Sequence, residues 1–282
     1  MNWTNFRSFI WVALLASTLT LPGCAAPSPQ ADAQPADAAY ELRQQLMPTP
    51  LWLQGEQHDA AEHQALQAAL VRQLSNERAL AALVIEMAEA GDSTLGLKPT
   101  EDEATVKRAL RWDANRQAWP WAAYGPAIMV AVRAGVPVLG GNLPAADLRS
   151  AMANAALDGL LNPDALRSQQ AQIREGHCNL LPESQIAPMT RIQIARDQAL
   201  ARMAISALVP GKTVLLVAGN QHVRRDLGVP AYLPAGQPFR SVMALPANLS
   251  EDASAGQVNR LWTSPALAPR DHCAEFKRQL QR

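Results

Sequence analysis

The sequence predicts an α/β fold in which a mostly parallel central sheet is flanked by helices. Two observations predict it. Short apolar runs without polar alternation recur along the 282 residues, as is typical of strands that are buried on both faces. Helical stretches separate these runs, and this alternation builds parallel sheets. Residues 40–282 suit one domain of this class.

The N-terminal residues predict export and a lipid anchor. Arg7 precedes the apolar run from Phe9 to Leu21, which is too short to span a bilayer comfortably, and small residues then lead to Cys24. This order resembles a lipoprotein signal peptide over residues 1–23, with Cys24 as the lipidated residue. An ordinary cleaved signal or an uncleaved anchor is the alternative. Ala25 stands where many inner-membrane lipoproteins carry aspartate, so we expect the outer membrane.

The composition indicates a flexible tether and excludes one class of partner. Residues 25–38 contain no large apolar side chain, so residues 24–39 cannot bury enough surface to offset the entropy lost on ordering. The formal net charge of the chain is zero, and the sequence has no basic block. A nucleic-acid partner, which needs a basic surface, is therefore not expected.

The apolar runs are the predicted strands. Four of them are Leu51–Gln54, Ala82–Ile85, Val136–Leu139 and Thr213–Ala218, and Ser241–Leu245 is a fifth.

Helices are expected between these strands. Ala60–Leu74 carries apolar side chains at helical spacing, and Asp59 with Glu62 predicts a capping box at its start. Residues 92–180 are mostly helical by pattern, apart from the strand at Val136. We expect much of this region to be a helical insertion over the carboxyl edge of the sheet. A further helix runs from about Pro188 to Leu208.

Polar residues follow the predicted strands where each one ends. Gly55-Glu56-Gln57-His58 follows the first strand, Glu86 follows the second, and Gly219-Asn220-Gln221-His222 follows the fourth. The carboxyl ends of parallel strands share one edge, where ligands bind. We therefore expect Glu56, His58, Glu86 and His222 to share a site. The glycines are expected to let the backbone turn sharply and to leave room for a ligand.

Two kinds of chemistry suit this set of side chains. The four residues could ligate a divalent cation, or they could act without metal as an acid and a base on water. Two buried carboxylates should repel each other, so one pKa is expected to be raised and Glu86→Gln to leave the protein folded. A structural pair of Glu86 with Arg196 is the alternative. Gln193, Arg196 and Asp197 lie on one face of the helix before the fourth strand, at three- and four-residue spacing, and could support the site.

Two further groups of residues draw attention. Trp119, Trp121 and Tyr124 are close in sequence and could wall a flat apolar ligand, although such clusters more often fill cores. Cys178 and Cys273 remain once Cys24 is lipidated, and an exported pair favours a disulfide, with two free buried thiols as the alternative.

These residues together resemble the ChaN-like haem-binding lipoproteins of the Tiki, TraB and erythromycin-esterase-like superfamily. The resemblance covers residues 40–235. It rests on the following segments: Gly55 to Asp59, Glu86, Trp119 to Pro126, Asn142 to Pro144, Gly176 to Cys178, Arg196-Asp197, and Ala218 to His222 through Pro230.

The resemblance implies an α/β fold with a helical insertion, outer-membrane lipidation, and binding of haem or another small apolar ligand for iron acquisition. Superfamily relatives with Glu and His at these strand ends are hydrolases, some of them metal-dependent. An ester or peptide hydrolase is therefore the alternative function, and a scaffold without chemistry is a third. No haem ligand transfers by motif, which leaves Tyr40, Tyr124, His63 and His177 as candidates. An exposed aromatic surface could bury haem in a homodimer.

Overall fold

A six-stranded, all-parallel sheet organises the chain, in the order β3-β2-β4-β1-β5-β6. The structure, a computed structural model, describes residues 29–112, 119–249 and 255–280. The strands are β1 (Leu51–Glu56), β2 (Leu80–Glu89), β3 (Val138–Asn142), β4 (Thr213–Gly219), β5 (Arg240–Pro246) and β6 (Arg260–Ser264). The predicted α/β class and the five predicted strands are confirmed. Sequence reasoning missed β6 because this short edge strand is half exposed and has no apolar run.

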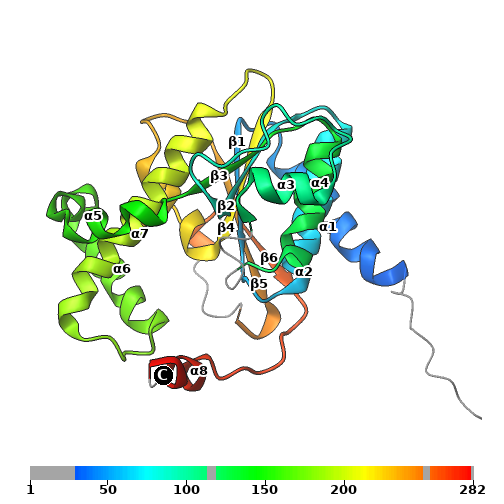
Figure 1. The fold of residues 1–282 in the computed structure, drawn as a ribbon. Helices are drawn as coiled ribbons and strands as arrows, with labels where there is room; N and C mark the ends of the chain where they lie inside the picture. Colours follow the sequence, from blue (N-terminus) through cyan, green and yellow to red (C-terminus); the bar gives the residue numbers. More distant parts are fainter. Residues whose placement is uncertain (1–28, 113–118, 250–254, 281–282) are drawn as a thin grey trace, which may run out of the picture.

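Helices cover both faces of the sheet (Figure 1). They are α1 (Pro29–Leu46), α2 (Ala61–Asn76), α3 (Glu103–Ala109), α4 (Trp121–Arg133), α5 (Leu148–Ala153), α6 (Pro163–Gly176), α7 (Glu183–Ser206) and α8 (His272–Leu280). Helices α1, α2 and α4 lie on one face and α7 on the other. No helix in these described ranges is long and apolar enough to cross a membrane.

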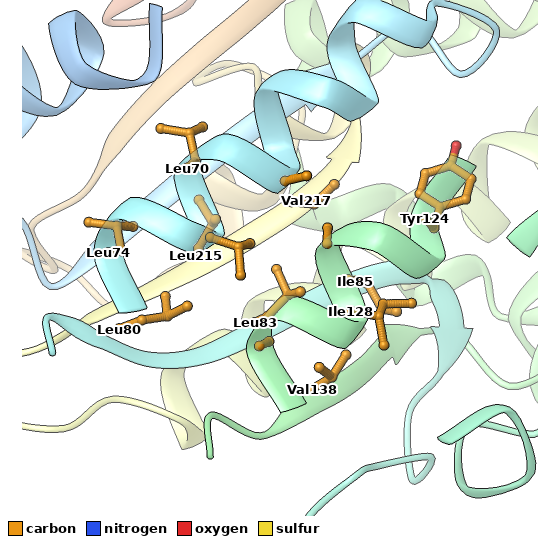
Figure 2. Packing of buried hydrophobic residues seen from close by; sticks show 14 of the residues in the cluster. Leu70, Leu74, Leu80, Leu83, Ile85, Tyr124, Ile128, Val138, Leu215 and Val217 are labelled. Atoms are coloured by element: carbon orange, nitrogen blue, oxygen red, sulfur yellow. The ribbon is translucent and has the colours of Figure 1, made fainter. Parts of the chain in front are cut away.

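Alternate side chains of each strand feed two separate cores. Leu83, Leu215 and Val217 pack against α2 and α4, as Figure 2 shows. Their neighbours Val84 and Leu216 point the other way and pack against α7. Both faces are therefore dry, which explains why the strands are continuous apolar runs in the sequence. Each such side chain contributes roughly 1.5–3 kcal/mol by leaving water.

The helical insertion is smaller than predicted. Helix α4 lies within the predicted range of 92–180, but it packs beside α2 on the sheet, with Ile128 fully buried in the core. It is therefore the crossover helix between β2 and β3, because its apolar residues have the sheet face to cover. Of the helices between β2 and β4, α5, α6 and the first part of α7 project away from the sheet (Figure 1).

The N-terminal segment also differs from expectation. Helix α1 begins at Pro29 and thus includes residues 29–39 of the predicted tether. Alanine is the strongest helix former, and Ala39 and Leu42 pack into the core beside α2. The predicted signal peptide and Cys24 lie outside the described residues. The predicted capping box is wrong as well, because the N-cap of α2 is Ala60 and has no side-chain cap.

Candidate functional site

The carboxyl ends of β1, β2 and β4 border a cavity of about 840 Å³, here called the strand-end cavity. Glu56, His58, Glu86 and His222, the four residues predicted to share a site, all lie along its inner wall. The outer wall is formed by α6 and by the chain at the start of α8. Its side chains are those of Gln169, Gln172, Ile173, His177, Arg270 and His272. A ligand site at this edge is what a parallel sheet favours.

Glu56 ends β1 and holds His58 in place. Its side chain is buried, and Oε1 accepts hydrogen bonds from His58 Nδ1 at 2.6 Å and from the Tyr124 hydroxyl at 2.7 Å. Oε2 accepts from the amides of Gln64, at 3.2 Å, and of Gln67. Four donors thus compensate the desolvation of this carboxylate. They also fix the proton of His58 on Nδ1, because a carboxylate can only accept.

The other nitrogen of His58 remains available at the cavity. The side chain is 42% exposed, and Nε2 lies 4.0 Å from Glu86 Oε2. Burial by itself lowers the pKa of His58, but the hydrogen bond to Glu56 and the charge of Glu86 raise it above the ordinary value. His58 is therefore an oriented imidazole that still exchanges a proton.

His222 forms a buried ion-pair chain with two carboxylates. It lies in the 3₁₀ turn Asn220–Val223, where Nδ1 is 2.6 Å from Asp197 Oδ1 and Nε2 is 3.4 Å from Glu86 Oε1. The backbone N–H of Gly219 donates to the other Glu86 oxygen at 2.8 Å. Glu86 lies within β2, not just past its end.

The charge states of Asp197, His222 and Glu86 follow from the geometry of their ion pairs. Burial alone lowers the pKa of His222, but Glu86 and Asp197 outweigh it and raise the pKa to about 10. Burial favours a protonated Glu86, yet His222, His58 and the Gly219 N–H hold its pKa well below the ordinary value. Burial raises the pKa of Asp197 to about 6 although His222 opposes this. His222 is therefore an imidazolium at neutral pH.

The predicted repulsion between two glutamates does not raise the pKa of Glu86. An imidazolium lies beside Glu86, and the Glu56 carboxylate is surrounded by its own four donors. For the same reason the expectation that Glu86→Gln leaves the fold intact is not supported. Removing that charge would leave His222 buried with less compensation.

The predicted metal set also lacks support. Among the residues that the structure describes, no three His, Cys, Asp or Glu side chains are grouped to hold a metal ion. The oxygens of Glu56 are taken by donors, and His222 carries protons on both nitrogens. Neither presents the free electron pair that a cation needs.

The two strand-end glycines are needed for space. A Cβ on Gly219 would lie 2.9 Å from His58 Nε2, and one on Gly55 would lie 2.5 Å from Asn220 Oδ1. Gly219 has a φ of −57°, which any residue adopts. Glycine is therefore not needed at position 219 for the expected sharp turn. It is needed because a side chain there would collide with His58.

The aromatic residues divide between core and site. Tyr124 is buried, and Trp121 packs edge-on against Trp112 at 5.2 Å, so these two follow the core alternative. Trp119 contacts His58, with ring centroids 4.8 Å apart. It lines a smaller neighbouring cavity of about 230 Å³ and not the strand-end cavity.

The helix α7 contributes the predicted supporting pair. Asp197 is buried and bonds to His222, as described above, whereas Arg196 lines both cavities. The structure gives Arg196 no ion pair with Glu86, whose oxygens face His222, His58 and Gly219. The alternative that Glu86 forms a structural pair with Arg196 is therefore wrong, because the partner of Glu86 is His222.

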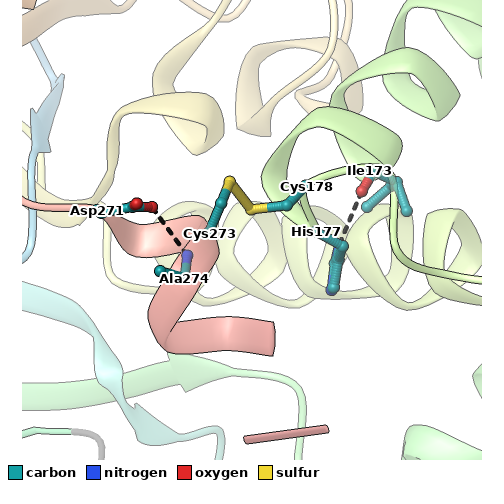
Figure 3. The surroundings of a disulfide bond; sticks show 6 residues. All are labelled: Ile173, His177, Cys178, Asp271, Cys273 and Ala274. Carbon is teal, nitrogen blue, oxygen red and sulfur yellow. Dashed lines mark hydrogen bonds between the residues drawn. A yellow bond between two sulfur atoms is a disulfide. The ribbon is translucent and has the colours of Figure 1, made fainter. Parts of the chain in front are cut away.

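A disulfide ties the outer wall together. Cys178, which follows α6, is bonded to Cys273 at the start of α8 across a separation of 95 residues, as predicted (Figure 3). Asp271 caps α8 by accepting from the N–H of Ala274 at 2.8 Å. The bond places Arg270 and His272 at the cavity.

Sequence reasoning missed several residues of the site. Gln64 and Gln67, spaced three apart on α2, are buried polar residues on an apolar helix face, and this pattern could have revealed them. Arg270 and His272 reach the cavity only through the disulfide and the fold of the C-terminal chain, which no local pattern shows.

Comparison with known proteins gives one family and a shared fold. The family model described as "Haem-binding uptake, Tiki superfamily, ChaN" matches residues 42–233. No curated protein matches the chain. The fold is similar to that of ChaN of Campylobacter jejuni, described with cofacial haem binding, at 21% identity and a TM-score of 0.62 over 79% of this chain and 88% of that one.

Two other solved structures are more distant. The type III effector HopBA1 is 15% identical, with a TM-score of 0.46 over 83% of this chain and 94% of that one. An erythromycin esterase EreC mutant in its open conformation is 14% identical, with a TM-score of 0.44 over 73% and 72%. The family match spans most of the domain, including every strand-end residue described above. The chain belongs to the ChaN family of haem-binding uptake proteins in the Tiki superfamily.

Proposed function

We propose that this protein is a haem-binding lipoprotein of the cell envelope, anchored to the outer membrane through Cys24 and acting in the acquisition of haem or iron. Family membership supports haem as the ligand class. The signal-like N-terminal sequence supports the anchor, and the disulfide between Cys178 and Cys273 supports an oxidising compartment.

The geometry of His177 is the observation that supports a haem site at the strand-end cavity. Its Nδ1 lies 2.7 Å from the carbonyl oxygen of Ile173, so Nδ1 must carry the proton (Figure 3). Its ring packs edge-on against Phe276 at 5.6 Å, and the residue lines the strand-end cavity. An imidazole oriented by a backbone carbonyl through one nitrogen is the usual state of a histidine that ligates a metal through the other.

The other candidates for an axial ligand are less suitable. His63 is buried, and Gln57 N and Ser264 Oγ engage its two nitrogens. The Tyr124 hydroxyl donates to Glu56 inside the core. Tyr40 is 59% exposed but lies on α1 and does not line the cavity. His222 holds protons on both nitrogens and cannot ligate at neutral pH.

The strand-end cavity is large enough for haem, although Ile173 and Pro120 are the apolar side chains of its otherwise polar lining. Its volume falls within the range of roughly 300–1,000 Å³ that small-molecule and cofactor sites occupy. Haem supplies an iron that takes a nitrogen or oxygen axial ligand. His177 would hold the iron, and Arg196 lies at the same cavity as a partner for a propionate, whereas Arg270 is already paired with Glu275 and Asp59.

Titration of the purified protein with haemin, followed by the Soret band, tests this proposal. We expect saturable binding, which His177→Ala weakens while shifting the Soret maximum. His272→Ala is the matched control, because it removes an imidazole from the same wall. Binding no better than that of an unrelated protein contradicts the haem function, and an unchanged spectrum in His177→Ala contradicts the ligand. Sedimentation with and without haemin tests a homodimer.

A second candidate function is hydrolysis of an ester or peptide bond, favoured by the pair Glu56 and His58. The buried carboxylate holds the Nδ1 proton, and Nε2 is exposed at the cavity as a general base for water. His222 has the role of a fixed cation beside Glu86 and not of a second base.

The hydrolase function is tested by measuring ester turnover. Turnover of an ester panel should disappear in His58→Ala and rise with pH through a pKa above 6.5, since the neutral imidazole is the base. His63→Gln, which removes a structural imidazole outside the cavity, should retain turnover wherever the protein still folds. No turnover by the parent protein, or equal turnover in His58→Ala, contradicts the hydrolase function.

A further inference from the structure

The smaller cavity beside Trp119 adjoins His58, the candidate general base. Its volume is about 230 Å³, and it shares Glu86 and Arg196 with the strand-end cavity. Trp119 in its wall packs edge-on against His58, with 4.8 Å between the ring centroids. A group bound in the smaller cavity would therefore lie next to the imidazole that can activate water.

The wall of the smaller cavity is mainly apolar, in contrast to that of the strand-end cavity. Trp119, Leu143 and Leu148 line it and are half-buried, so apolar surface remains open to it. Removing such surface from water is favourable. The described apolar lining as a whole consists of Met87, Ala88, Trp119, Leu143, Ala145 and Leu148.

Two polar residues in this wall already bind donors of the protein. Glu89 Oε1 accepts a hydrogen bond from the N–H of Ala145 at 3.1 Å, and Oε2 lies 3.5 Å from a guanidinium nitrogen of Arg111. Asn142 Oδ1 accepts from the N–H of Leu143 at 2.9 Å. These oxygens therefore stabilise the chain after β3 and do not require a polar ligand.

The two residues shared with the strand-end cavity are engaged as well. Glu86 faces His222 and the N–H of Gly219. Arg196 lies within the electrostatic reach of Asp197. The charges at the boundary are therefore balanced within the protein, and the interior of the smaller cavity suits an uncharged, apolar group.

The volume of the smaller cavity limits the size of that group. An apolar cavity of roughly 150 Å³ takes a benzene ring, whereas sites for cofactors and drug-sized ligands occupy roughly 300–1,000 Å³. A cavity of about 230 Å³ therefore suits one phenyl ring or a short alkyl chain and is too small for a porphyrin.

We propose that the smaller cavity binds the apolar acyl group of an ester that the protein hydrolyses, so that its substrates are esters of aromatic or short-chain carboxylic acids. This inference rests on the hydrolase function proposed above and names its substrate class. The acyl group is bonded directly to the carbonyl carbon that water attacks, so it belongs in the cavity beside His58. The alcohol side then extends into the larger, polar strand-end cavity.

The reaction needs only water and the ester. His58 Nε2 accepts a proton from water as the water oxygen adds to the carbonyl carbon. The bond from that carbon to the alcohol oxygen then breaks, and the alcohol leaves with the proton that His58 returns. The products are the carboxylic acid and the alcohol.

Two 4-nitrophenyl esters with the same leaving group test the substrate class on the purified full chain. The benzoate carries a phenyl ring on its carbonyl carbon, and the acetate carries a methyl group. Leu148→Trp, which fills the cavity, should lower the ratio of kcat/KM for the benzoate to kcat/KM for the acetate by about 10- to 100-fold, because the phenyl ring loses its burial. Leu160→Trp is the matched control, since Leu160 is 46% exposed and lines neither cavity.

A second variant guards against misfolding. Leu148→Gln removes apolar surface without filling the cavity and should lower the ratio in the same direction. It replaces Leu148→Trp if the tryptophan variant melts below the parent protein. An unchanged ratio in the folded variant, or an equal fall in Leu160→Trp, overturns the proposal while the hydrolase function stands.

Acetophenone separates the binding of the apolar group from the hydrolase function, because it has a phenyl ring and a carbonyl but no bond to hydrolyse. If the parent turns over neither ester, the hydrolase function fails, and a titration with acetophenone decides the apolar subsite. The indole N–H signal of Trp119 in NMR spectra reports binding. A saturable shift that Leu148→Trp abolishes supports the subsite, and no such shift overturns it.

Discussion

His58 and His222 show how one sequence pattern gives two different groups. Each follows a strand in a Gly-x-Gln-His segment, yet Glu56 and Glu86 set them apart. His58 has one carboxylate at Nδ1 and 42% of its side chain exposed, so its Nε2 can bind or take a proton. His222 is buried between Asp197 and Glu86 and is a permanent cation near neutral pH. The burial of each ring and the distances to its two carboxylates, and not the motif, decide its chemistry.

The charge of His222 should make stability fall in alkali. Its folded pKa of about 10 lies above the ordinary value of 6.5. Its contribution to folding is therefore full below pH 6.5 and is lost as the pH rises towards 10. Urea unfolding should show the parent losing more than about 1 kcal/mol, the equivalent of one pKa unit, between pH 7 and pH 9.5.

Two substitutions separate His222 from the rest of the protein. His222→Gln should be less stable at pH 7 and should lose less between pH 7 and pH 9.5 than the parent does. His272→Gln, at an exposed imidazole, should follow the parent curve. An equal alkaline loss in parent and His222→Gln would show that other groups cause it.

At the scale of elements, the site depends on how closely β1, β4 and the turn after β4 approach one another. Strand β1 lies between β4 and β5, and β4 between β2 and β1, so the ends of the central strands meet. Gly219 faces the ring of His58, and Gly55 faces Asn220. The absence of a side chain at each position allows these two strand ends to close on each other.

Gly219→Ala should therefore lower the stability of the protein and disturb the surroundings of His58. The added methyl group would lie 2.9 Å from His58 Nε2, so the ring or the strand end must shift. We expect a loss of about 1–3 kcal/mol in urea unfolding, as for overpacking in a core. The NMR titration of His58 should move as well, because its contacts with Glu56 and Glu86 change.

A glycine in open surroundings provides the control. Gly159→Ala adds a methyl group with nothing within 4 Å, so it should leave both stability and the His58 titration unchanged. A Gly219→Ala protein that matches the parent in both measurements would show that the strand ends can accommodate a methyl group.

At the scale of the whole molecule, the sequence predicts the sheet well and the site only in its inner half. The strands could be recognised because burial on both faces makes them apolar, and Glu56, His58 and His222 follow them directly. The outer wall could not be predicted, because Gln172, His177 and Arg270 meet there through the packing of α6 and a disulfide. The charge of His222 depends on distances of a few ångströms to Asp197 and Glu86, which no spacing in the chain encodes.

The disulfide should maintain this outer wall. The Cys178→Ser, Cys273→Ser double variant should lose about 2–4 kcal/mol in urea unfolding, the effect typical of a bond that closes a long loop. Its C-terminal segment, which contacts Asp59 through exposed ion pairs of Arg270 and His272, should become sensitive to protease and haemin binding should weaken. The parent under reducing conditions should behave alike. Unchanged cleavage and affinity in both would show that the wall holds without the bond.

The position of the outer-wall residues in the chain also determines when, during synthesis, the protein can bind a ligand in the cavity. Glu56, His58 and Glu86 of the inner wall are synthesised early, whereas Arg270 and His272 complete the cavity last. A chain that crosses a membrane unfolded and N-terminus first has no finished cavity until those residues have passed through. If the protein is exported as proposed, ligand is captured only in the compartment where the chain completes its folding, and haem cannot leave the cell interior bound to the chain during export.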